Sequence, residues 1–154
     1  HLREVQLNTL ELPHTAMALA LDVGEEDDIH PKNKQPVGER LALAARATVY
    51  GEDICYSGPI TSRVDIDGNT AVVHYEHVCT GLKSSGGALR AFEVAGSDGH
   101  FVHAQAEIQG DTVIVRSEAV SEIEAVRYAW SGFPNSNLYN ESDLPAVPFR
   151  TDKE

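Results

Sequence analysis

The sequence predicts an α/β segment over residues 1–55, followed by an antiparallel β-sandwich over residues 56–154. Two observations predict this division. In the first part, a nearly unbroken apolar run lies between two segments with helical spacing, a pattern typical of α/β layers. In the second part, short strand-like segments follow one another at intervals of about 8–12 residues, which is typical of a sandwich. The hydrophobic fraction of 42% is enough for a core and excludes wholesale disorder.

The α/β segment begins with a helix that Pro13 ends, because a proline ring cannot continue a helix. Residues 16–23 then form an apolar run typical of a strand buried on both faces. A short core helix is the alternative, but the flanking Pro13 and Gly24 favour a strand. Residues 36–50 predict a second helix, with Gly51 placed to end it. The apolar positions at helical spacing are Leu2, Val5, Leu7 and Leu10 in the first helix and Val37, Leu41, Ala44, Ala45, Thr48 and Val49 in the second.

The predicted strand leads into an acidic turn at residues 24–31, so the order is helix, strand, acidic loop, helix. This order is typical of the end of an α/β layer. One strand with two helices leaves both strand edges without partners. We therefore expect residues 1–55 to be the C-terminal segment of a larger catalytic layer.

The β-sandwich is predicted from strand segments separated by glycine-containing turns. A loop is expected at residues 81–87, because their Ser-Ser-Gly-Gly sequence is too flexible for regular structure. Residues 145–150 are expected to be irregular or extended. The predicted strands are 63–67, 71–78, 91–95, 101–108, 112–116 and 125–130.

The chain is strongly acidic, with 24 Asp and Glu residues against 12 Lys and Arg residues and a formal charge of −12. Such a charge repels a phosphate backbone and an anionic membrane surface, so neither nucleic acid nor a membrane is an expected partner. No apolar stretch approaches the roughly 20 residues that span a bilayer. Cys55 and Cys79 either pair in an oxidising compartment or lie apart as small buried hydrophobes, and the sequence leaves both open.

The strongest candidates for chemistry are Asp27, Asp28 and His30, which follow the predicted strand. Open α/β sheets place their ligand crevice at this point. A carboxylate two or three residues before a histidine can hydrogen-bond the imidazole and leave its other nitrogen free as a base toward a serine. The alternative is a solvated acidic loop with a histidine at a helix entrance.

These residues open a block, Asp28-Ile-His-Pro-Lys-Asn-Lys-Gln-Pro-Val-Gly-Glu-Arg-Leu-Ala-Leu43, that resembles the C-terminal catalytic block of the sialate O-acetylesterase family. This family is a branch of the SGNH-type serine hydrolases. The resemblance implies an esterase that removes O-acetyl groups from sialic acid or related sugars without a metal or organic cofactor. It identifies His30 with the catalytic histidine and leaves Asp27 and Asp28 as alternatives for the acid. Further similar segments are Tyr50-Gly51, Tyr56–Pro59, Phe92–Ala95, Asp98-Gly99, Ala125–Trp130, Asn137–Asn140 and Leu144–Arg150.

The family's nucleophile lies in a Gly-Gln-Ser-Asn type motif, and no such string occurs in this chain. Ser57, Ser62 and Ser84 lie in or beside the β-rich part and are interpreted as turn residues. We therefore expect the chain to be a C-terminal fragment or subunit, inactive alone. Its partner would be the N-terminal part of the same enzyme, as a separate chain or an unseen segment that carries the serine. The expected substrate is an O-acetylated sugar, and the expected location is secreted, periplasmic or, in a eukaryote, lysosomal.

Two other functions stay open from the sequence. One is an esterase for acetylated xylan or another carbohydrate, and the other is a noncatalytic carbohydrate-binding β-module. Trp130, Tyr128 and Phe133 would suit a sugar-stacking platform, but a core or a domain interface is the favoured interpretation.

Several polar motifs are interpreted without a role in the reaction. Metal binding is not expected at His74-x-x-His77 or His100-x-x-His103, because residues three apart on a strand point to opposite faces. Asn140-Glu-Ser142 is a glycosylation sequon. Three basic residues follow His30, namely Lys32, Lys34 and Arg40. Their side chains would either hold an anionic substrate or remain solvated. A further alternative for Arg40 is a pair with an acid on its own helix.

Overall fold

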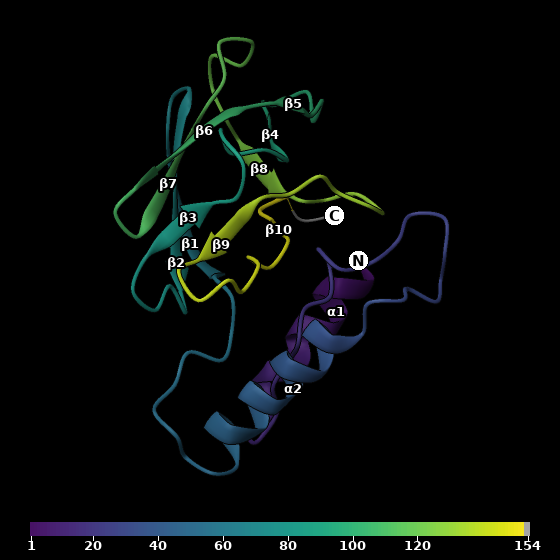
Figure 1. The fold of residues 1–154 in the computed structure, drawn as a ribbon. Coiled ribbons are helices and arrows are strands. Elements are labelled where there is room, and N and C mark those ends of the chain that lie inside the picture. The colour runs from purple at the N-terminus through teal and green to yellow at the C-terminus, as the bar shows by residue number, and fades with distance from the viewer. Residues whose placement is uncertain (153–154) are drawn as a thin grey trace.

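The computed structural model describes residues 1–152, with helices in the first third of the chain and strands in the rest (Figure 1). The helices are α1 (Leu2–Asn8), the short 3-10 helix η1 (Thr9–Glu11) and α2 (Gln35–Thr48). The strands are β1 (Ile60–Asp67), β2 (Thr70–Glu76), β3 (Leu82–Ser84), β4 (Phe92–Ala95), β5 (Val102–His103), β6 (Gln105–Gln109), β7 (Thr112–Arg116), β8 (Ala125–Tyr128), β9 (Leu138–Asn140) and β10 (Phe149–Arg150). Within the described part, no helix is long and apolar enough to cross a membrane.

Two four-stranded antiparallel sheets, in the orders β1-β2-β7-β6 and β10-β8-β4-β5, form the β-rich part. Their apolar faces share one core, since Val73 and Val113 of the first sheet belong to the same buried cluster as Val94 and Val126 of the second. A third, two-stranded sheet pairs β3 with β9. The prediction of a mainly antiparallel β architecture is therefore confirmed.

Alternation explains why β2 and β7 lie at the centre of the first sheet. Ala71, Val73 and Tyr75 are buried on β2, while the residues between them are half-buried. Val113 and Val115 are likewise buried on β7, and the register places Val73 opposite Val113. Because strand side chains alternate between faces, this pattern puts one face of each strand into the core.

The predicted strand at residues 101–108 is divided in the structure. β5 pairs with β4 in one sheet, whereas β6 pairs with β7 in the other. The chain changes sheets at Ala104, whose backbone N–H donates to the Phe92 carbonyl at 3.0 Å. An unbroken strand pattern in the sequence therefore corresponds to a connection between the two sheets.

Two further expectations about the β-rich part are wrong. The segment 81–87 contains β3, which forms because β9 supplies a hydrogen-bonding partner 54 or more residues later along the chain, as in the register pair Ser84 and Leu138. The strand predicted over 125–130 ends at Tyr128, since Ala129 has a φ of 51° and leaves the extended conformation.

The apolar run at residues 16–23 forms no strand and ends in a turn, so the prediction of a strand buried on both faces is wrong. A strand needs a neighbour to complete its hydrogen-bond ladder, and among residues 1–152 none pairs with this run. Leu21 alone of the run belongs to the buried core cluster. The larger catalytic layer expected for residues 1–55 thus remains a prediction.

Both predicted helices are confirmed, but the apolar stripe of α2 is not buried. Leu41 is 54% exposed and Val49 is 70% exposed, whereas the buried positions are Arg40 and Ala44. Gly51 has a φ of 70°, which fits its predicted place just after the helix. Helices α1 and α2 therefore present apolar side chains to solvent on one side of the molecule.

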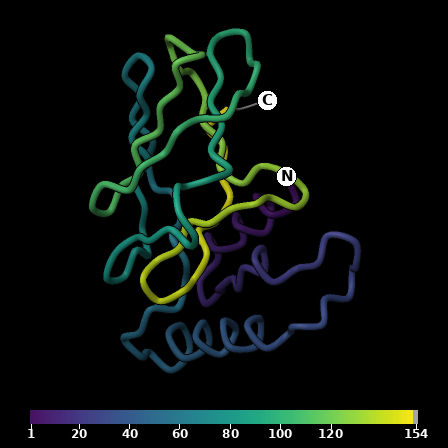
Figure 2. Tube along the Cα trace, turned by 45° about the horizontal axis from the view of Figure 1, so that its top comes forward, coloured from purple at the N-terminus to yellow at the C-terminus, as the bar shows by residue number. Residues whose placement is uncertain are grey.

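The helical segment lies at one end of the sheets in both views, with the N-terminus beside the loop that follows β8 (Figures 1 and 2). Arg3 of α1 donates to the carbonyls of Ser131 and Gly132 in that loop, at 2.9 and 2.7 Å. Glu4 accepts from the Arg150 guanidinium of β10 at 3.1 Å. These contacts fix α1 against the β-rich part.

Candidate active site

The loop between residues 24 and 34 carries the predicted catalytic residues and is shaped by its own acidic side chains. Glu25 and Asp28 form an isolated antiparallel bridge, and the Glu25 carboxylate accepts from the Lys32 backbone N–H at 3.0 Å. The polar turn expected from the sequence is therefore present, and its carboxylates are partly engaged in closing it.

The structure brings Asp28 against His30. One Asp28 carboxylate oxygen accepts from the His30 backbone N–H at 2.8 Å and lies 3.9 Å from the His30 Nδ1 atom. The imidazole is 85% exposed and the Asp28 side chain 44% exposed. Asp27 is exposed and makes no hydrogen bond or ion pair within residues 1–152. A small rotation of the ring would let Asp28 accept from Nδ1 and leave Nε2 directed outward as a base.

A buried ion pair joins the two ends of this loop. The Arg40 guanidinium of α2 donates to both carboxylate oxygens of Asp22 at 2.7 Å, and a further bond reaches the Leu19 carbonyl at 2.6 Å. The two charged side chains are only 9% and 16% exposed. Arg40 is therefore neither solvated nor paired on its own helix, and the bidentate geometry fixes the spacing between residues 22 and 40.

The Asp22 carboxylate also receives a weak hydrogen bond from the Tyr139 hydroxyl at 3.4 Å, which connects the ion pair to β9. Burial raises the pKa of the Tyr139 phenol, and the negative charge of Asp22 raises that pKa further. The hydroxyl therefore stays protonated and acts as a donor at neutral pH. The loop that carries His30 is thus anchored to the β-rich part through the Asp22 and Arg40 pair.

The interpretation of the candidate serines as turn residues fits only Ser57, because Ser62 lies in β1 and Ser84 in β3; all three hydroxyls are bonded locally. Ser57 donates to the Gly58 carbonyl at 3.0 Å, and Ser62 donates to the His74 carbonyl at 3.3 Å. Ser84 donates to the Gly87 carbonyl. Among residues 1–152, no serine hydroxyl hydrogen-bonds His30, so this part of the chain does not assemble a nucleophile and base pair.

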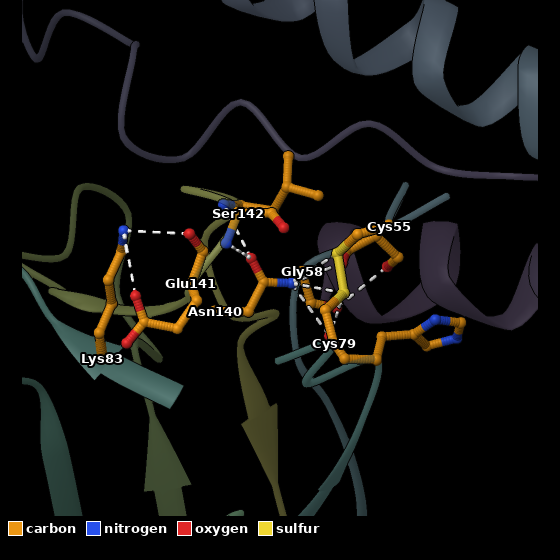
Figure 3. The surroundings of a disulfide bond; sticks show 10 residues. Cys55, Gly58, Cys79, Lys83, Asn140, Glu141 and Ser142 are labelled. Carbon is orange, nitrogen blue, oxygen red and sulfur yellow. Dashed lines mark hydrogen bonds and ion pairs between the residues drawn. A yellow bond between two sulfur atoms is a disulfide. The ribbon is translucent and has the colours of Figure 1, made fainter. Parts of the chain in front are cut away.

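Cys55 and Cys79 form a disulfide that joins the segment after α2 to the turn after β2 (Figure 3). Asn140 lies beside it and is fully buried. Its side-chain amide donates to the Ser57 and His77 carbonyls at 2.9 and 3.0 Å. The sequence left the pairing of the cysteines open, and the structure resolves it in favour of the bond.

The sequon Asn140-Glu-Ser142, which would have meaning only in a eukaryotic secretory setting, is buried at Asn140 in this fold. The Asn140 side-chain oxygen accepts from the backbone N–H groups of Ser142 and Leu144 at 3.2 and 3.1 Å (Figure 3). A glycan requires an exposed amide nitrogen, and this nitrogen is buried against two carbonyls. The sequon pattern contains no information about burial, so the sequence could not show this role.

His74 and His77 contact side chains outside the loop that carries His30. The His74 ring is 2.9 Å from the Asp65 carboxylate, and the His77 ring packs edge-on against Tyr56. Within residues 1–152, no group of three or more His, Cys, Asp or Glu side chains is arranged to hold a metal ion.

The three aromatic residues considered as a sugar platform separate into two environments. Tyr128 is fully buried in the core, where burial raises the pKa of its phenol to about 12. Trp130 is half-buried, and Phe133 is 49% exposed on the loop after β8. The expectation of a core or interface role is thus confirmed for Tyr128, whereas Phe133 lies outside the core and its interface role stays a prediction.

Comparison with known proteins places these features in a context. The chain is 31% identical to the sialate O-acetylesterase of Mus musculus and 30% identical to that of Homo sapiens, over 90% of its own length in each case. It spans only 28% and 29% of those two proteins. No family model matches the chain.

A solved structure is much closer in sequence. The crystal structure of a carbohydrate acetylesterase from Xanthomonas citri superposes with a TM-score of 0.96 at 49% identity. The similarity covers 99% of this chain and 36% of that one. The resemblance to sialate O-acetylesterases is therefore confirmed, and it extends over a part of those proteins, as expected for a C-terminal portion.

Proposed function

We propose that this chain is the C-terminal part of an SGNH-type carbohydrate O-acetylesterase and supplies the catalytic histidine, His30, to a serine from another part of the same enzyme. The observation that carries the proposal is the open imidazole of His30 with an Asp28 oxygen 3.9 Å from Nδ1, in a chain similar to carbohydrate acetylesterases over nearly its whole length. Asp28 is the acid in this proposal, and Asp27 remains solvated.

In the proposed reaction, the serine oxygen attacks the acetyl carbonyl while His30 Nε2 takes the serine proton. The imidazolium then gives this proton to the departing sugar oxygen, so the sugar leaves as an alcohol and the acetyl group remains on the serine. In the second half, His30 takes a proton from water, which attacks the acetyl-serine. The imidazolium gives this proton to the departing serine oxygen as acetate leaves, so the serine and the neutral His30 are regenerated. Asp28 holds the ring orientation and stabilises the imidazolium, and no metal or organic cofactor takes part.

The exposed apolar side chains of the helical segment support an assembly with further protein. Leu2 and Val5 on α1 and Leu41 on α2 are more than half exposed, and so are Val49 and Tyr50 after α2. Several large apolar side chains left exposed on one segment fit an interface with further protein. We propose that the serine-bearing part of the enzyme packs on this side and completes the layer that residues 1–55 begin.

Sialic acids with O-acetyl groups are the proposed substrate, and acetylated xylan is the alternative. The first follows from the mouse and human relatives, and the second from the broader description of the Xanthomonas citri enzyme as a carbohydrate acetylesterase. A secreted, periplasmic or lysosomal location is proposed, since the Cys55 and Cys79 disulfide is expected to persist in an oxidising compartment.

The test is acetate release by the complete assembly of this chain with the serine-bearing part. His30→Ala should lower turnover by several orders of magnitude, as expected for a triad member. His100→Ala, which removes another exposed histidine, is the matched control and should leave turnover unchanged. Asp28→Asn should reduce turnover far more than Asp27→Asn. Unchanged turnover in His30→Ala would instead support a noncatalytic β-module.

Two further arms define the substrate and the division of labour. Relative kcat/KM on O-acetylated sialic acid and on acetylated xylan distinguishes the two substrate classes. The chain of 154 residues alone should hydrolyse 4-nitrophenyl acetate no faster than buffer. Hydrolysis by this chain alone that a serine-directed inhibitor abolishes would refute the proposal that the nucleophile comes from elsewhere.

A further inference from the structure

A cleft of about 510 Å³ lies between the loop after β8 and the ends of β4 and β5. Phe133 and Trp130 form its aromatic part. Arg90, Glu93 and His103 contribute polar side chains to the lining. An apolar surface faced by a few polar groups is the usual composition of a small-molecule site.

We propose that this cleft binds a sugar ring of a glycan, independently of ester hydrolysis. A pyranose has a face of C–H groups and a rim of hydroxyls, so it needs an aromatic surface on one side and hydrogen-bonding groups at its edge. The cleft has both. The proposal does not rest on the assignment of His30, because it requires binding and no reaction.

Phe133 provides the aromatic surface. Its side chain is 49% exposed although it is large and apolar, and it is next in the chain to Pro134, which also lines the cleft. The loop that carries Phe133 is fixed by the hydrogen bonds from Arg3 to the carbonyls of Ser131 and Gly132. The ring is thus presented to solvent on a loop whose backbone is fixed.

The polar rim comes from a row of residues across neighbouring strands. The register aligns His103 of β5, Glu93 of β4 and Arg127 of β8 on the outer face of the sheet. Arg127 is engaged by Asp152, whereas Glu93 and His103 make no hydrogen bond or ion pair within residues 1–152. Their polar atoms are therefore available to sugar hydroxyls, with Glu93 as an acceptor.

Arg90 completes the rim from a rigid loop. Its guanidinium reaches the carbonyls of Asn135 and Gly86 at 3.4 Å, and its backbone N–H donates to the Asn137 side chain at 2.9 Å. The buried amide of Asn137 donates in turn to the Ala88 carbonyl at 2.9 Å. These bonds hold the rim in place before a ligand arrives, which lowers the entropic cost of binding.

Backbone strain marks the same cleft. Ala91 and Ala129, which both line it, have φ angles of 64° and 51°. The left-handed conformation is unfavourable for a residue with a Cβ atom, and such residues gather at functional sites. The Ala129 backbone N–H donates to the Ala91 carbonyl at 2.9 Å, so the two strained residues are joined. Ala91 directly precedes β4 and Ala129 directly follows β8, so the chain turns away from the sheet at both residues, at the cleft.

The cleft also approaches the catalytic loop. A Cβ atom at Gly24, the first residue of that loop, would lie 3.8 Å from the Phe133 ring. Figures 1 and 2 both place the loop after β8 beside the chain that leads to α2. The cleft therefore borders the first residue of the loop that carries His30.

The test is oligosaccharide binding by the chain of 154 residues, followed through Trp130, its single tryptophan. Titration with xylohexaose and with 3′-sialyllactose should give a saturable change in tryptophan fluorescence for at least one of them, and ligand-observed NMR provides a second readout. Phe133→Ala should weaken binding at least about tenfold, which corresponds to about 1.4 kcal/mol. Glu93→Gln should also weaken it, without altering the fold.

Tyr50→Ala is the matched control, because it removes an exposed aromatic ring at the far end of α2 and should leave the affinity unchanged. Binding of only one of the two oligosaccharides supports the proposal and identifies the type of glycan. No binding of either by both readouts would overturn it. So would an affinity that Phe133→Ala and Tyr50→Ala leave equally unchanged.

Discussion

Replacing Asn140 with alanine should be among the most damaging single substitutions in the β-rich part. The side chain is fully buried and makes four hydrogen bonds to backbone groups. Two are donated to the carbonyls of Ser57 and His77, and two are accepted from the N–H groups of Ser142 and Leu144. Alanine removes all four partners and leaves buried backbone groups unsatisfied.

The magnitude follows from that count. At about 1 kcal/mol for each net hydrogen bond, Asn140→Ala should lower the free energy of unfolding by about 4 kcal/mol. A domain of this size is stable by about 5–15 kcal/mol, so the variant should remain folded in buffer but unfold at a clearly lower urea concentration. The additional contacts of the amide with the sulfur atoms of Cys55 and Cys79 should contribute little, because sulfur is a weak acceptor.

Urea unfolding followed by circular dichroism measures this change. Asn33→Ala, which truncates an exposed asparagine in the loop before α2, is the matched control and should stay within about 0.5 kcal/mol of the parent. A loss below about 1 kcal/mol in Asn140→Ala would refute the argument, because it would mean that water or a backbone shift replaces the four bonds.

Expression in glycosylating cells should leave the parent chain without a glycan at Asn140, as measured by intact mass.

Two other predictions concern the termini of the β-rich part. Arg127 donates to Asp152 and lowers the pKa of that carboxyl. The pair therefore stabilises the fold above the unfolded pKa of about 3.9, and this contribution is lost as the pH falls through the lower folded pKa. The difference in urea midpoint between the parent and Asp152→Asn should shrink from about pH 6 to about pH 3, and a constant difference would contradict this. The disulfide closes a loop with a sequence separation of 24, so reduction, or the double variant Cys55→Ser and Cys79→Ser, should cost roughly 3 kcal/mol by the loop-entropy model, measured as a fall in urea midpoint; equal midpoints with and without reductant would argue against a bond that constrains the unfolded chain.

The sequence predicted those strands best whose partners follow closely along the chain. The predicted strand 112–116 has the bounds of β7, because alternating residues between two turns leave little choice. The sequence predicted strands poorly where their pairing depends on residues far along the chain. β3 exists because β9 lies beside it, and residues 16–23 fail to form a strand because no partner lies beside them in the described part of the chain. An apolar run in a sequence indicates that the segment tends to be buried, but it does not specify which other segment covers it.

For the candidate site, the sequence could place Asp28 near His30, since the contact spans two residues and arises within one turn. It could not show that Arg40 pairs with Asp22, because the contact joins two segments separated by the whole loop. The role of Asn140 was hidden for a related reason. Polar residues with buried partners follow no periodicity, and only the folded chain shows which amide is enclosed.

The enclosed Arg40 and Asp22 pair should make the loop that carries His30 tolerant of salt. Exposed pairs such as Lys83 with Asp143 weaken as mobile ions gather around them, whereas charges removed from water are screened much less. At high and at low salt concentration, the two ends of that loop should thus keep the same separation. The His30 imidazole between them should then keep the same position.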